Sequence, residues 1–203
     1  MSDIVDKIRQ EVIDRSNAFE ERTKGTKDEF NIYKEHIQYV YKNILLLSEN
    51  KNVDREVLEL SALLHDISMT DERLDRSKHN EYGSVIAENL LREINYPEDK
   101  IKLVKKCILN HSSKMAGFRT TEEERILVDA DGLTHFDFNT IKNLYSLAQN
   151  VMGLNDEDAI KFIQEKLTKD YNEMSDYLKY LIQEKYDKVM KINTIDELLV
   201  TMQ

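Results

Sequence analysis

Proline and glycine are scarce in this chain, which has one Pro and five Gly among its 203 residues. Folds with many hairpins or crossover connections need these residues at their turns. Segments that alternate Val, Thr and aromatic residues with polar ones, as half-buried strands do, are nearly absent. These absences favour long helices joined by few turns, and we predict an all-α fold.

Cysteine is represented by Cys107 alone, so neither an intramolecular disulfide nor a cysteine-rich zinc site can form. Any metal ion must therefore be bound by carboxylates and by some of the five histidines. No apolar run approaches the roughly 20 residues that a membrane-spanning helix needs. The first residues, MSDIVDKIRQEV, are charged and amphipathic, unlike the apolar centre of a signal peptide. We expect a soluble, cytoplasmic protein with no membrane partner.

Acidic residues outnumber basic ones by 39 to 29, which gives a formal net charge of −10. A chain-wide attraction to nucleic acid or to anionic lipid is therefore disfavoured. An anionic ligand would need a local group of Lys and Arg side chains.

Apolar residues recur at helical spacing in a series of segments. The first runs from Ile4 to Phe19 and the second from Tyr33 to Leu47. The third is almost wholly apolar, begins after Asp54 as N-cap and ends at His65-Asp66. Similar stripes predict helices over 79–91, 101–111, 122–133, 141–147, 159–167 and 177–182. The polar segments 68–78 and 112–120 are expected to be loops.

We expect these helices to form a single domain. Residues 1–30 would be an N-terminal helix that packs on the core, and residues 31–150 would be the core. Residues 151–203 would be C-terminal helices of the same domain, serving as a cap or as an oligomer surface in a homodimer.

His65 and Asp66 place an imidazole and a carboxylate side by side at the end of an apolar helix. Burying an unpaired carboxylate costs several kcal/mol, and a divalent cation would remove that cost. Taken alone, the dipeptide fits a helix-end histidine with a capping aspartate better than it fits a metal site. Its meaning therefore depends on the other histidines and carboxylates of the chain.

The order of His36, then His65-Asp66, then Asp131 resembles that of the HD-domain metal-dependent phosphohydrolases. The matching segments lie between residues 34 and 137 and are KEHIQYVYKN, LELSALLHDIS, KHNEYGSVIAENLL, CILNHSS and ILVDADGLTHFD. The resemblance implies an HD-type helical bundle with a helical C-terminal extension, and it makes these four residues the ligands of one metal ion. Two nitrogen and two oxygen donors suit Mn, Fe, Ni, Co, Mg or Zn. Asp129 would serve as an acceptor that orients a histidine.

His79 and His111 have three possible roles. Some phosphodiesterase branches of the resembled family use two further histidines at similar points for a second metal, so we expect one ion or two. In single-metal members, such histidines would contact a substrate phosphate instead. A histidine at the start or end of a helix can also be purely structural, and we expect a structural role for His135.

The reaction that the resemblance implies is hydrolysis of a small phosphorylated substrate, a nucleotide among the candidates. A bound metal ion lowers the pKa of its water from 15.7 toward about 7. Asp66 would also hold the attacking water, and Asp71 or Glu72 would act as general acid or base. Cationic side chains of the two polar loops are the candidates for phosphate contacts, together with His79 and His111, and they are Arg73, Arg76, Lys78, Lys114 and Arg119.

Three other functions fit the same residues. One is a non-catalytic regulatory module that binds a metal or a nucleotide. The second is a cyclic-nucleotide-type phosphodiesterase with two metals, and the third is an oxygenase with redox-active iron. The chain also departs from the resembled family, because Ser68 ends an HDIS motif and Gly132 stands where many members have a basic residue.

Overall fold

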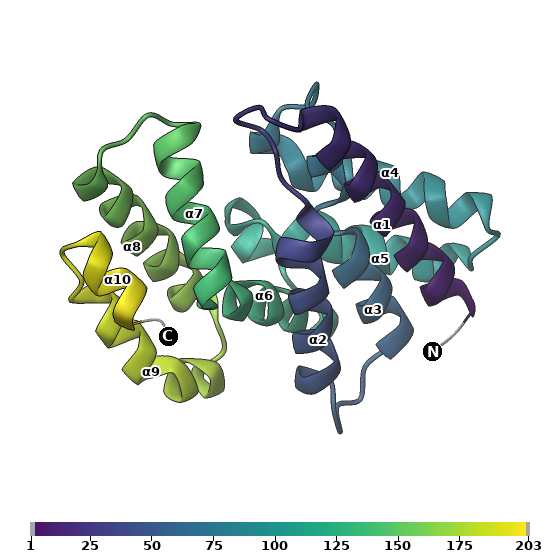
Figure 1. Cartoon of the computed structure of the whole chain (residues 1–203). Coiled ribbons are helices and arrows are strands. Elements are labelled where there is room, and N and C mark those ends of the chain that lie inside the picture. Colours follow the sequence, from purple (N-terminus) through teal and green to yellow (C-terminus); the bar gives the residue numbers. More distant parts are fainter. Residues whose placement is uncertain (1–2, 202–203) are drawn as a thin grey trace. The chain divides into compact units, whose positions relative to one another are not determined.

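The computed structural model describes residues 3–201 of the chain. Over that range it contains ten α-helices, four short helical segments and no strand (Figure 1). The predicted all-α class is therefore confirmed. The helices divide into two compact units, one ending at Ala130 and the other beginning at Asp131. The boundary lies inside a single helix.

The first unit is built around one buried helix. Its helices are α1 (Asp3–Thr23), α2 (Gln38–Leu47), α3 (Arg55–Leu64), α4 (His79–Glu93), α5 (Glu98–His111) and the first part of α6 (Glu122–His135). Helix α3 lies at the centre, where α1, α2 and α5 pack on it. Every side chain from Val57 to Leu64 is buried. Asp54 caps this helix as predicted, because its carboxylate accepts the N–H of Val57 at 3.2 Å.

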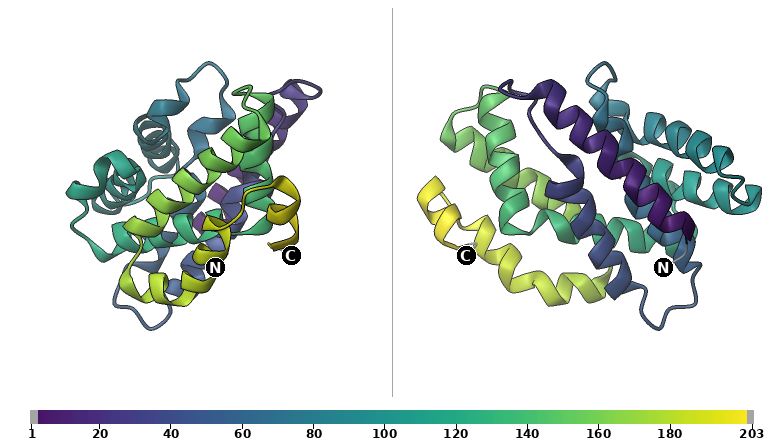
Figure 2. Two further views of the ribbon diagram at one scale, coloured as in Figure 1. Left: turned by 90° about the vertical axis from the view of Figure 1, so that its left-hand side faces the viewer. Right: turned by 45° about the vertical axis from the view of Figure 1, so that its right-hand side comes forward.

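Helices α4 and α5, drawn in teal in Figure 2, form an antiparallel helical hairpin. The turn between them contains Asn95, which adopts a positive φ of 55°. The side chain of Asn80, near the start of α4, donates to the carbonyl of Leu109, near the end of α5, at 2.7 Å. The hairpin therefore brings the first residue of α4, His79, close to the last residue of α5, His111.

Two segments differ from the sequence prediction. Residues Tyr33–Ile37 form a π-helical turn before α2 rather than the start of one regular helix. Asn31 precedes this turn, where its side chain accepts the N–H of Lys34 at 3.0 Å and its own N–H donates to the carboxylate of Glu35 at 3.0 Å. In the predicted loop after His65-Asp66, 3-10 turns cover Ile67–Thr70 and Arg76–Lys78.

The second unit contains the end of α6 and four further helices. These are α7 (Phe138–Asn150), α8 (Asp156–Glu173), α9 (Asp176–Met190) and α10 (Ile195–Thr201). Helix α8 packs on α7 and on α9, and α10 packs on α9. The sequence predicted the first three of these helices and missed α10, which is only seven residues long. Within residues 3–201, no helix combines the length and apolarity needed to cross a bilayer.

Candidate metal centre

Three histidines of the first unit are fixed by the backbone at helix ends. His65 follows α3, and its Nδ1 lies 2.9 Å from the carbonyl oxygen of Ala62. Nδ1 of His79 and Nδ1 of His111 lie 3.0 and 2.6 Å from the carbonyl oxygens of residues 76 and 108. A carbonyl oxygen only accepts hydrogen bonds, so each Nδ1 carries the proton. In the neutral ring, each Nε2 then carries a lone pair, which is the form that binds metals.

These Nε2 atoms meet in two pairs. Nε2 of His79 lies 3.1 Å from Nε2 of His111, and Nε2 of His36 lies 3.1 Å from Nε2 of His65. In the His79–His111 pair, two lone pairs at this distance repel each other unless a cation or a proton lies between them. Two nitrogens bound to one ion at about 2.0–2.1 Å lie roughly 2.9–3.4 Å apart. The spacing therefore fits two ligands of the same metal ion in each pair.

Asp66 lies between the two histidine pairs. Its Oδ2 is 3.8 Å from Nε2 of His36 and 3.6 Å from Nε2 of His65. Its Oδ1 is 3.7 Å from Nε2 of His79 and from Nε2 of His111. Each oxygen of one carboxylate thus faces a different histidine pair. Asp66 could therefore supply one oxygen to an ion held by each histidine pair.

The carboxylate of Asp66 also fits a cation site by its surroundings. Burial raises its pKa, but the nearby rings of His65, His111 and His79 outweigh burial and hold the pKa well below its usual range. Among the described residues, Oδ1 is buried and has no hydrogen-bond donor within reach. A buried, ionised oxygen without a donor is costly, and a metal ion would remove that cost.

Asp131 follows Ala130 in the same unbroken helix, α6. The carbonyl of Ala130 accepts a hydrogen bond at 3.2 Å from the side chain of Asn43 on α2, and consecutive Cα atoms are only about 3.8 Å apart. One carboxylate oxygen of Asp131 and one ring nitrogen each of His36 and His65 lie within 4.8 Å of one another, and so do ligand atoms of Asp66, His79 and His111. All six predicted metal-ligand candidates therefore belong to one of two groups of three.

The comparison with protein families finds a match to the HD domain over residues 33–135, just over half of the chain. The matched range begins before His36 and ends after Asp131. The chain belongs to the HD-domain family. No curated protein and no solved structure matches it in the corresponding comparisons.

The six metal-ligand candidates, here called the HD site, differ in their exposure to solvent. His36, His65 and His111 are buried, with 6%, 0% and 6% of their surface exposed. The side chains of Asp66 and His79 are 18% and 27% exposed. The HD site therefore reaches solvent on the side of His79 and Asp66, where a substrate or water has access.

Several polar side chains position these histidines. The hydroxyl of Ser68, two residues after Asp66, donates to the carbonyl of His79 at 2.9 Å. The side chain of Asn110, beside His111, donates to the buried carboxylate of Glu124 at 2.5 Å. Glu124 also accepts the N–H groups of Thr120 and Thr121 at 2.9 and 2.8 Å. The sequence analysis missed these residues, although Thr121-x-x-Glu124 is a capping-box pattern.

Gly83 permits a close approach of α4 to the end of α3. A Cβ at this position would lie 3.0 Å from the carbonyl oxygen of His65 and 3.5 Å from Cγ2 of Ile108. His79 lies one turn earlier on the same helix. The absence of a side chain at Gly83 therefore helps to bring the two histidine pairs together.

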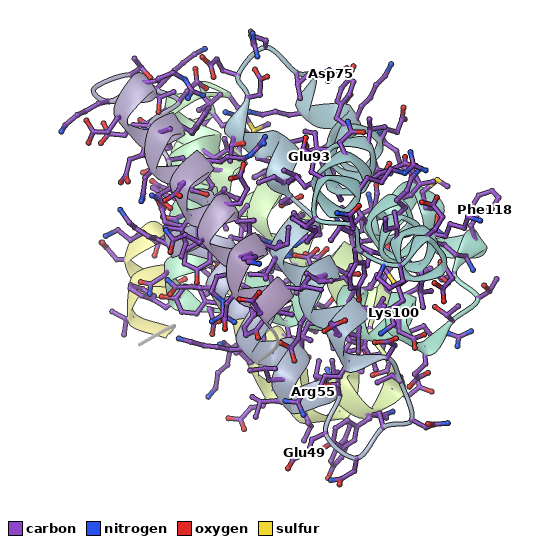
Figure 3. All side chains as sticks on the ribbon, turned by 90° about the vertical axis from the view of Figure 1, so that its right-hand side faces the viewer. Glu49, Arg55, Asp75, Glu93, Lys100 and Phe118 are labelled. Atoms are coloured by element: carbon purple, nitrogen blue, oxygen red, sulfur yellow. The ribbon has the colours of Figure 1, made fainter. Side chains whose placement is uncertain are left out.

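The residues of loop 68–78 that were predicted as acid, base or phosphate ligands contact one another, α1 or the segment that follows α1. Arg73 donates twice to Asp71, at 2.6 and 2.8 Å, and holds the pKa of that carboxyl at about 2. Arg22 donates to Glu72 at 3.2 Å, and Arg76 donates to Asp28 at 3.4 Å. Figure 3 labels Asp75 at the outer edge of this loop. Asp71 is thus ionised at neutral pH, which does not suit a general acid.

The other predicted phosphate ligands differ in their surroundings. Lys78 is exposed directly before His79. The ammonium of Lys114 donates to the carbonyl of Ser77 at 3.3 Å. The guanidinium of Arg119 donates to the carbonyls that end α5, those of residues 110, 111 and 112, at 2.9 to 3.2 Å. Arg119 thus contacts the end of α5, which carries His111. Phosphate binding by Lys78, Lys114 and Arg119 remains a prediction.

Proposed function

We propose that this HD-domain protein is a metal-dependent phosphohydrolase whose two metal ions share Asp66. The observation that carries the proposal is the position of Asp66, with one oxygen toward each pair of facing Nε2 atoms. Ordinary packing gives no reason for Nε2 of His79 and Nε2 of His111, which both carry a lone pair, to face each other beside the carboxylate of Asp66.

The first ion would be held by His36, His65, Asp66 and Asp131. The second would be held by Asp66, His79 and His111. Four neutral imidazoles and two carboxylates do not fully compensate two divalent ions, so the loaded site would keep a positive charge. This local charge would attract a phosphate despite the net charge of −10 on the whole chain.

Divalent ions in such a site lower the pKa of a bound water and neutralise phosphoryl oxygens. The protein's own residues would do the remaining work. Asp66 would orient the water that attacks phosphorus, on the partly exposed side of the site. Lys78 and Lys114 are the preferred phosphate contacts, because Arg73 and Arg76 already bond to carboxylates. The substrate would be a small phosphorylated molecule, with nucleotides as the first candidates.

The test is a combined measurement of metal content and turnover. Purified protein would be loaded with Mn²⁺, Fe²⁺, Co²⁺, Ni²⁺, Zn²⁺ or Mg²⁺ and assayed against phosphomonoesters, nucleoside triphosphates and cyclic nucleotides. We expect bound metal together with phosphate release or cyclic-phosphodiester cleavage, and at least a 100-fold loss of turnover in Asp66→Asn. The matched control is Asp156→Asn on α8, where the carboxylate accepts from Tyr145 at 2.8 Å.

Two outcomes would contradict the proposal. Failure to bind any metal would remove its basis. Metal binding without turnover on the whole panel would favour a non-catalytic regulatory module.

A further inference from the structure

A cluster of charged side chains in the second unit lies outside the proposed set of metal ligands. His135, the last residue of α6, faces Lys166 and Asp170 of α8. Nδ1 of His135 is 3.0 Å from Oδ2 of Asp170, and Lys166 donates to both oxygens of Asp170 at 2.7 and 2.8 Å. The side chain of Asp170 is only 9% exposed. A buried cluster of this kind has a defined geometry, unlike a surface ion pair.

His135 also connects this cluster to Asp131. The two residues are four apart on α6, and Nε2 of His135 lies 3.7 Å from Oδ1 of Asp131. The ring thus has a different neighbour at each nitrogen. Its Nδ1 faces α8, and its Nε2 faces the carboxylate that the proposed function assigns to the first metal ion.

The neighbours of the ring determine which nitrogen carries a proton. Lys166 lies 3.1 Å from Nδ1 and can only donate, which leaves the single ring proton on Nε2. Nε2–H then lies on the side of Asp131, 3.7 Å from its Oδ1. A bare lone pair on Nε2 would face a carboxylate oxygen and is disfavoured.

Close packing of α6 against the end of α8 holds the cluster in place. A Cβ at Gly132 would lie 2.9 Å from Cε of Met174 and 3.7 Å from Cβ of Asp170. Gly132, next to Asp131, stands where many members of the resembled family carry a basic residue.

We propose that His135 is a positioning residue for the first metal ion. Lys166 and Asp170 fix its ring, and its Nε2–H holds the carboxylate of Asp131 in the orientation that binds the ion. The inference rests on the proposed function, because it takes Asp131 as a ligand. Ligating carboxylates and histidines are commonly oriented by neighbours outside the ligand set, whose loss typically costs about 10- to 100-fold in metal affinity.

The test is a titration of the metal-free full chain with Mn²⁺. The electron paramagnetic resonance signal of free Mn²⁺ measures how much of the ion is unbound at each step. His135→Leu and Asp170→Asn should each lower the affinity for the first ion about 10- to 100-fold. His135→Gln keeps an N–H donor and should restore most of the affinity. A merely structural role would not distinguish Gln from Leu in this way. Asp156→Asn, an Asp substitution on the same helix, should change nothing, and circular dichroism of each metal-free variant checks folding.

Asp131→Asn separates this inference from the proposed function. If Asp131→Asn weakens Mn²⁺ binding while Asp170→Asn and both His135 variants stay within twofold of the unmodified protein, the positioning role is wrong and the proposed function stands. If Asp131→Asn has no effect on Mn²⁺ binding, the ligand assignment of the proposed function is wrong, and the positioning role is wrong with it.

Discussion

The side chain of Asp66 lies between the two pairs of facing histidines, and His111 belongs to only one of these pairs. Its Nε2 faces His79 at 3.1 Å and Oδ1 of Asp66 at 3.7 Å. Substitution of His111 should therefore remove one ion and leave the other. We predict that His111→Gln binds one equivalent of Mn²⁺ where the unmodified protein binds two, as measured by metal analysis after gel filtration. Loss of both ions would show that the two groups do not bind independently.

Gly83 gives a second prediction at the residue scale. Alanine favours a helix interior over glycine by about 1 kcal/mol, but a Cβ here would press on the carbonyl oxygen of His65 at 3.0 Å. Overpacking typically costs about 1–3 kcal/mol. We expect Gly83→Ala to lower the free energy of unfolding and to weaken Mn²⁺ binding. Gly117→Ala is the control, because no heavy atom lies within 4 Å of a Cβ there. Equal behaviour of the two variants in urea unfolding would contradict the packing argument.

The six metal-ligand candidates could be named from the sequence because the chain has only five histidines and because the order of His36, His65-Asp66 and Asp131 resembles that of a known family. The sequence could not predict that Asp66 faces both histidine pairs, since this depends on side-chain directions at three helix ends. The contact of Lys166 and Asp170 with His135 could not be predicted from the sequence, because charged residues on one face of a helix usually lie in solvent.

At the scale of elements, Glu124 connects the start of α6 to the end of α5. Its carboxylate accepts from the N–H groups of Thr120 and Thr121 and from the side chain of Asn110. Helix α6 carries Asp131, and α5 ends at His111. One buried carboxylate therefore fixes two helices that each supply a metal-ligand candidate.

The pKa of Glu124 makes this contact testable. Burial raises the pKa, but hydrogen bonds from Asn110, Thr120 and Thr121 outweigh burial and lower it from 4.5 to about 2. The folded protein thus favours the ionised form. Its contribution to stability is complete above about pH 4.5 and is lost as the pH falls toward 2.

We predict that Glu124→Gln destabilises the protein by about 1–3 kcal/mol at pH 7. It should also flatten the fall in stability between pH 4.5 and 2, as measured by urea unfolding at a series of pH values. Glu122→Gln is the control, because its exposed ion pair with Lys51 is worth at most about 1 kcal/mol. A pH profile unchanged by Glu124→Gln would contradict this role.

The helices themselves were largely predictable, since apolar spacing, the Asp54 cap and the scarcity of Pro and Gly are local signals. The π-helical turn at Tyr33–Ile37 was not predicted, because it depends on side-chain bonds of Asn31 to neighbouring residues. Turns of this kind occur frequently at functional sites, and this one carries His36. The short α10 has too few residues for a clear apolar stripe.

For the whole molecule, the metal ions should contribute to stability as well as to chemistry. Removing them leaves Oδ1 of Asp66 buried without a hydrogen-bond donor among the described residues, and a ligand that binds the folded state alone stabilises it by mass action. We expect Mn²⁺ at 100 times its Kd to raise the free energy of unfolding by about 2.7 kcal/mol per ion. Chelation with EDTA should lower the melting temperature, as measured by calorimetry. Identical melting curves with and without metal would count against a built metal site.

The boundary between the two compact units lies at Asp131, inside α6. The single domain that the sequence predicted, with a core over residues 31–150 and C-terminal helices over 151–203, stays a prediction. Apolar stripes indicate which residues are buried, but they do not indicate which helices share a core. The sequence therefore gave no signal for a division within a continuous helix.

The most direct test of the shared carboxylate is the electron paramagnetic resonance spectrum of the protein loaded with two equivalents of Mn²⁺. Two ions bridged by Asp66 would lie about 3.5–4 Å apart, as in other two-metal sites. We predict the spectrum of an exchange-coupled Mn²⁺ pair, which Asp66→Asn abolishes. The spectrum of isolated ions, or binding of a single equivalent only, would contradict the account.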